Sequence, residues 1–141
     1  MKFATMISLA CLLAVGLLFS EVARAYHSYL LTVQQLQTSL SKGPSRAEKG
    51  FVLVDVRTPA EHAAGSIPGT DLNIDFREIK SRHHDIGAQL DDHIVVYCQS
   101  GHRSNIAAET LADLGYRHVY NVSGSMNAWL AAGFPVEQPK R

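Results

Sequence analysis

Short apolar runs alternate with amphipathic stretches along most of this chain. Runs with little polar interruption predict buried strands at residues 51–56, 94–97 and 118–122, with a brief strand at 71–74. Between these runs, apolar residues recur at helical spacing. Strands that alternate with helices predict an α/β domain with a mostly parallel central sheet.

Four stretches are expected to be helical, and the residues between them are expected to be loops. The helices are predicted after Thr32 and over residues 75–84, 104–114 and 125–132. The expected buried stripe of the third helix is Ile106, Ala107, Leu111 and Leu114. Glycine and proline make residues 41–50 and 57–70 loops, with at most one helical turn at 60–64. Trp129 is expected to hold the last helix to the sheet.

The N-terminus has the pattern of an export signal. Lys2 precedes an apolar run, and Ala23-Arg24-Ala25 is a small-x-small cleavage motif. We therefore expect a signal peptide at residues 1–25 and a mature domain at 26–141, located in the periplasm or secreted.

Two other fates of this N-terminal segment stay open. The apolar run at residues 3–19 is short for a membrane anchor, and no cluster of positive charge follows it. A lipid on Cys11 is the second alternative, although Cys11 lies within the run and not at its end.

The net charge of the chain does not indicate a binding partner for the domain. The chain has 13 Lys and Arg and 13 Asp and Glu, so its formal net charge is zero. A near-neutral chain has no basic field for nucleic acid and no acidic tail, and nothing predicts a membrane partner once the signal is removed. Cys98 is the only thiol of residues 26–141, so no disulfide can form within that domain and its stability must come from packing.

The loop after the strand at 94–97 predicts a nucleophile. Cys98 begins a short loop that contains Gly101 and Arg103 and leads directly into a helix. Backbone amides and the positive end of a helix dipole then point at the sulfur and stabilise its thiolate. A buried cysteine that only fills the core is the alternative, but a flexible glycine and an anion-binding guanidinium favour a reactive thiol.

Three segments, in this order, resemble the single-domain rhodanese family, the thiosulfate sulfurtransferases. They are residues 55–62 with 65–69 and 73–74; residues 96–104; and residues 114–116 with 121–124, 128–129 and 133–136. Ser66 stands where the family often has histidine, and Ser125 where it usually has a second glycine. We expect neither serine to touch the chemistry.

The resemblance implies a three-layer fold with helices on both sides of the sheet, and a double displacement without a cofactor. Cys98 would take the outer sulfur of thiosulfate, or of a similar donor, and hold it as a persulfide until a thiol or cyanide-like acceptor removes it. Arg103, with help from His102, would attract the donor. The substrate-binding residues implied are Gln99, Ser100, Gly101, His102, Arg103 and Ser104.

Two other functions on this framework stay open. Four residues separate Cys98 from Arg103, whereas the related dual-specificity phosphatases and arsenate reductases resemble one another in having five. The resemblance therefore favours sulfur transfer over a cysteine-based phosphatase or arsenate reductase. The second alternative is a non-enzymatic module that carries persulfide sulfur or binds a partner; the intact Cys98 and Arg103 weigh against a module without chemistry.

The remaining polar residues are given structural roles. Asp55, Arg57 and Glu61 are expected to organise the loop near the site, with an ion pair between Arg57 and Glu61. No metal site is predicted, because the adjacent His83 and His84 point about 100° apart on a helix and have no Cys or Glu partner at ligand spacing.

Overall fold

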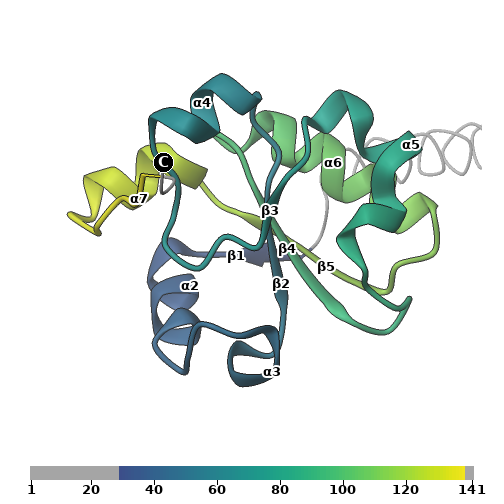
Figure 1. Ribbon diagram of the computed structural model, residues 1–141, viewed down its shortest axis with the longest axis horizontal. Helices are drawn as coiled ribbons and strands as arrows, with labels where there is room; N and C mark the ends of the chain where they lie inside the picture. The colour runs from purple at the N-terminus through teal and green to yellow at the C-terminus, as the bar shows by residue number, and fades with distance from the viewer. Residues whose placement is uncertain (1–28, 139–141) are drawn as a thin grey trace, which may run out of the picture.

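The computed structural model describes residues 29–138, and Figure 1 shows their arrangement. The predicted signal peptide at residues 1–25, including Cys11 and the cleavage motif, lies outside the described residues. No helix within residues 29–138 is long and apolar enough to cross a membrane.

Five strands of the described residues form one parallel sheet in the order β1-β5-β4-β2-β3. The strands are β1 Leu30–Leu31, β2 Val52–Asp55, β3 Leu72–Asn73, β4 His93–Tyr97 and β5 His118–Val122. The α/β class and the parallel sheet are confirmed, and the last strand has its predicted bounds. Parallel order brings the carboxyl ends of β2 and β4 to one edge, where Asp55 is the partner of Tyr97.

Helices cover both faces of the sheet (Figure 1), as the three-layer prediction requires. They are α2 Val33–Leu40, α3 Arg46–Lys49, α4 Pro59–Ala64, α5 Ile79–Arg82, α6 His102–Asp113 and α7 Ser125–Ala131, with 3-10 turns η1 Phe76–Glu78 and η2 His83–Ile86. Leu36 of α2 and Trp129 of α7 belong to the core of one face, and Ile79 of α5 and Leu111 of α6 to the core of the other.

The cap and core predictions for α2 and α7 are confirmed. The Thr32 hydroxyl accepts from the amide of Gln35 and the Gln35 side chain accepts from the amide of Thr32, which closes a capping box at the start of α2. Trp129 is fully buried, and its indole donates to the carbonyl of Pro135 at 2.8 Å.

Three predictions about helices were wrong. Residues 41–50 contain α3, because Ser45 and Glu48 form a capping box in a segment that lacks an apolar stripe. The stretch at 75–84 is divided into η1, α5 and the start of η2. Ile106 is 40% exposed, whereas Ala107 and Leu111 are buried as predicted and Leu114 is partly buried against the same core. The buried face of α6 is completed by Ser104 and Ala108.

Candidate active site

Cys98 lies where β4 ends and before α6 begins, at the carboxyl edge of the sheet. The residue is fully buried in the described structure, and it belongs to the core cluster under α6. Gly101 has φ 103°, a left-handed conformation that turns the chain directly into α6. An added Cβ there would meet the Gly124 amide nitrogen at 3.4 Å, so both conformation and space favour glycine.

The loop directs hydrogen-bond donors at the sulfur. The Gly101 amide lies 3.0 Å from Sγ, and the Ser104 hydroxyl lies 3.2 Å from it. Burial alone would raise the pKa of the Cys98 thiol, but the Ser104 hydroxyl and the amides of Ser104, Gly101 and Ser100 outweigh it, so the pKa is lowered. The arrangement therefore favours a thiolate, which is the nucleophilic form of cysteine.

The start of α7 fixes the peptide planes of the loop. The amide of Met126 donates to the carbonyl of Cys98 at 3.1 Å, and that of Asn127 donates to the carbonyl of Gln99 at 2.9 Å. The Gln99 side-chain amide also donates to Asn127 Oδ1 at 2.7 Å. Because these two carbonyls face α7, they are held away from a negative charge on the sulfur.

Ser125 contacts the backbone of Cys98, although we expected it to lie apart from the site. Its Oγ accepts from the amide of Cys98 at 3.1 Å and donates to the carbonyl of Val122 at 2.9 Å. Among the described residues, Ser125 is the only non-glycine with positive φ, at 46°. The contact spans 27 positions of sequence, so no local pattern indicated it. Ser66, the other departure, packs elsewhere, against the backbone of Glu137.

Asn121 is a site residue that the sequence reasoning missed. Its Oδ1 lies 2.6 Å from the Ser104 hydroxyl, and its Nδ2 donates to the carbonyl of Gly101 at 3.2 Å. A serine hydroxyl has one proton, so Ser104 can donate it to the sulfur of Cys98 or to Asn121, but not fully to both. The available signal was a buried amide within the apolar strand β5, where a polar side chain needs a partner.

Arg103 is held by a carboxylate of α4. Its two terminal nitrogens donate to the two oxygens of Glu61 at 2.9 and 2.8 Å. Glu61 Oε2 also accepts from the amide and the hydroxyl of Thr58, in the capping box that begins α4. Arg103 lowers the pKa of Glu61 to about 2, and Thr58 assists against a smaller opposing effect of burial. Glu61 is therefore ionised throughout the physiological pH range.

The predicted ion pair between Arg57 and Glu61 was wrong, because both residues have other partners. Arg57 Nη2 lies 2.7 Å from Asp55 Oδ2 and also donates to the carbonyl of Gly65 at 2.6 Å. Asp55 is completely buried, and His62 Nδ1 lies 2.9 Å from the same oxygen. These contacts tie the end of β2 and Arg57 to the second half of α4 and to the Gly65 that follows it.

The remaining loop side chains point to the periphery. Ser100 and His102 are exposed, and both line a cavity of about 310 Å³ together with Asn105 and Asn121. Ser100 contributes its amide to the sulfur, whereas the side chain of Gln99 bonds to α7 and also lies 3.4 Å from Arg57 Nη1.

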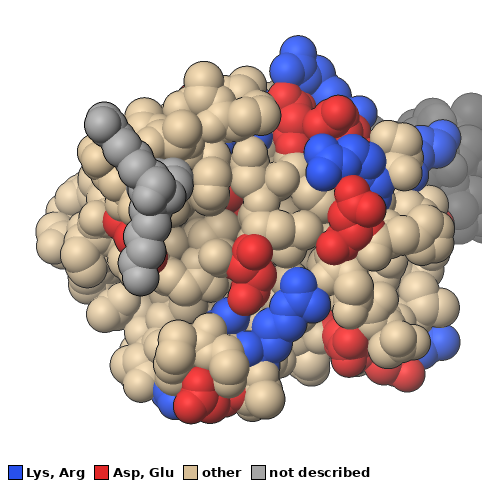
Figure 2. Space-filling model, viewed as in Figure 1, with Lys and Arg blue, Asp and Glu red and all other residues tan. Residues whose placement is uncertain are grey.

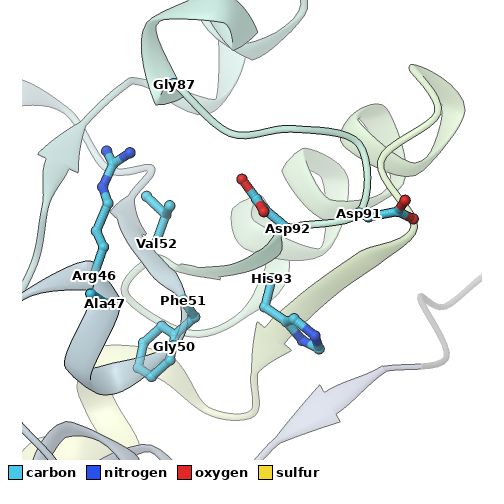
Figure 3. A pocket seen from close by; sticks show the side chains of 9 residues that line it. All are labelled: Arg46, Ala47, Gly50, Phe51, Val52, Gly87, Asp91, Asp92 and His93. Carbon is cyan, nitrogen blue, oxygen red and sulfur yellow. The ribbon is translucent and has the colours of Figure 1, made fainter.

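A second cavity, of about 390 Å³, lies at the opposite edge of the sheet (Figure 3). Its lining residues come from α3 and from the amino ends of β2 and β4, among them Arg46, Val52, Asp92 and His93. None of the predicted site residues lines it. Within residues 29–138, no group of three or more His, Cys, Asp and Glu could hold a metal ion.

Comparisons with known proteins agree with this geometry. A family model described as the rhodanese-like domain matches residues 32–132, a range that includes every site residue described above. A sulfurtransferase of Allochromatium vinosum is 40% identical over 89 residues, which cover 63% of this chain and 80% of that protein. The human thiosulfate:glutathione sulfurtransferase is 32% identical over 112 residues, which cover 71% and 91%. The crystal structure of a rhodanese-related protein from Thermoplasma volcanium matches with a TM-score of 0.65 and 28% identity, over 79% of this chain and 99% of that one.

Proposed function

The chain belongs to the family of rhodanese-like domains, and from this premise we propose that it moves sulfane sulfur through a persulfide on Cys98. The donor is thiosulfate or a similar small molecule, and the acceptor is a thiol or a cyanide-like nucleophile. Similarity to proteins named sulfurtransferases supports sulfur transfer as the class of activity. The observation that carries the residue assignment is the pair of donors at 3.0 and 3.2 Å from the sulfur of Cys98.

In the first step the Cys98 thiolate attacks the outer sulfur of thiosulfate. A bond forms between the two sulfurs, the bond inside thiosulfate breaks, and its electron pair leaves with sulfite. The negative charge is then on the outer sulfur of the Cys98 persulfide. Fixed amides around the loop stabilise this charge without reorganising, because α7 already holds the peptide planes.

In the second step an acceptor nucleophile attacks the outer sulfur and Cys98 leaves as a thiolate. The donors that lower the pKa of Cys98 also make it a better leaving group, since both effects stabilise the same anion. No proton has to move to or from the cysteine within a cycle that starts and ends with the thiolate. The signal pattern at residues 1–25 supports an exported enzyme.

Intact mass measurement tests the proposal. Thiosulfate should add one sulfur, about 32 Da, to the wild-type protein, and cyanide should remove it. The Cys98→Ser protein should show neither change, and a wild-type rate of thiosulfate turnover by this variant would refute the assignment. Uptake of sulfur without delivery to any small acceptor would favour the non-enzymatic carrier. On protein purified from its own cell, the same spectrum shows whether residues 1–25 have been removed.

A further inference from the structure

Each arginine around the Cys98 loop is paired with a carboxylate. The pairs are Arg57 with Asp55, Arg77 with Asp75, and Arg103 with Glu61. Figure 2 shows the same mixture on the face that it draws, where blue and red side chains lie side by side and no field of one sign is present. A dianion that approaches the loop therefore meets no surplus of positive side chains.

Among these carboxylates, Glu61 is the one that binds Arg103, and Arg103 is the residue expected to attract the donor. Its carboxylate accepts one hydrogen bond from each terminal nitrogen of Arg103. The amide and hydroxyl of Thr58 donate to the same carboxylate and hold it in place. Both partners are accessible, with 26% and 34% of their side chains exposed, so a donor reaching Arg103 also comes near Glu61.

We propose that Glu61 is a specificity-determining residue that disfavours doubly charged sulfane donors, such as thiosulfate, relative to singly charged alkyl persulfides. The inference rests on the proposed function, because it concerns the donor that loads Cys98. A dianion is repelled by the carboxylate about twice as strongly as a monoanion at the same distance. The penalty arises when the donor binds beside the intact ion pair, where the carboxylate repels it directly. Displacing Glu61 from Arg103 costs the same for either donor, because the carboxylate loses its partner in both cases.

Both donors load Cys98 by balanced reactions. Thiosulfate transfers its outer sulfur and releases sulfite, as described above. With an alkyl persulfide anion, the Cys98 thiolate attacks the terminal sulfur, the sulfur–sulfur bond of the donor breaks, and its electron pair leaves on the alkyl thiolate. The product on the enzyme is the same Cys98 persulfide, so one measurement follows both donors.

The test compares wild type and Glu61→Gln with thiosulfate and with 2-hydroxyethyl persulfide, whose alkyl group has no charge. The readout is the second-order rate of the mass gain on Cys98. Glutamine keeps an oxygen for the Thr58 amide, so the start of α4 can still be capped. We expect the rate with thiosulfate to rise about 5- to 10-fold and the rate with the persulfide at most about 2- to 3-fold. The change in the ratio should shrink at high salt.

Glu48→Gln is a matched control. Glu48 has the same place in the capping box of α3, and α3 lies at the other end of the domain from α4 (Figure 1), so this variant loses the same charge far from the loop. Its donor ratio should equal that of wild type. An unchanged ratio in Glu61→Gln, or equal losses with both donors, would overturn the proposal and leave Glu61 a support for the loop. Failure of the wild-type protein to gain sulfur from either donor is a different result, which would refute the proposed function itself.

Discussion

Replacing Ser104 with alanine removes the hydroxyl that lies between the sulfur of Cys98 and the amide of Asn121. In the wild type this hydroxyl is 3.2 Å from the sulfur and 2.6 Å from Asn121 Oδ1. A hydrogen bond to a charged group contributes about 1.5–3 kcal/mol. Because Asn121 competes for the single proton, we expect the lower end, about 1.5 kcal/mol, which corresponds to about 10-fold in the population of the thiolate.

The Ser104→Ala variant should therefore have a raised Cys98 pKa. Alkylation by iodoacetamide, followed from acidic to alkaline pH, reports it, because only the thiolate reacts. At a given pH below the pKa, the variant should be alkylated about 10-fold more slowly than wild type, whereas the two rates should be similar on the alkaline plateau. Thr110→Ala is the control, since Thr110 is also on α6 but donates its hydroxyl to the carbonyl of Ile106. A pH profile of Ser104→Ala that coincides with wild type would refute the idea that this hydroxyl stabilises the thiolate.

Two other substitutions test neighbouring parts of the site. Asn121→Leu removes the acceptor that competes for the Ser104 proton, so alkylation of Cys98 at pH below its pKa should become faster by about 2- to 5-fold, and a slower reaction would contradict the competition. Glu61, whose pKa falls from 4.5 to about 2 on folding, contributes stability that is present above pH 4.5 and is lost as the pH falls toward 2. Urea unfolding should therefore show wild type more stable than Glu61→Gln at neutral pH, with the difference disappearing by about pH 2, and a difference that does not depend on pH would contradict the sign of this linkage.

Most of the fold could be predicted because its elements have local signals. The apolar strand β5 and the threonine cap of α2 are short-range patterns, and the structure has both where they were expected. The local apolar pattern did not predict α3, because this helix has only four residues and no apolar face, and it is defined by the two polar residues of a capping box. The pattern failed again at Ile106, because Ile106 and Ala107 lie about 100° apart on α6 and the sequence does not show which of them faces the core.

The position of Cys98 at the end of a strand and the amides around its sulfur could be predicted because they are contiguous in sequence. The partners of the loop could not be predicted in the same way. The strand end and the loop spacing favoured a pair between Arg57 and Glu61, yet the partner of Glu61 is Arg103, 42 positions further along the chain. Such contacts depend on the parallel strand order, which brings α4, α6 and α7 to the carboxyl edge of the sheet. No single segment of the sequence indicates this order.

The dependence of the loop on α7 has a consequence for how the protein is made. The carbonyls of Cys98 and Gln99 are held by amides of Met126 and Asn127, so the loop is complete only when the end of the domain is in place. Before the domain has folded, the loop amides do not surround the sulfur, and Cys98 is an ordinary thiol with little nucleophilic character at neutral pH. A chain that ends before α7 lacks the two hydrogen bonds from Met126 and Asn127, so we expect its Cys98 to be less easily oxidised or loaded with sulfur than that of the folded domain.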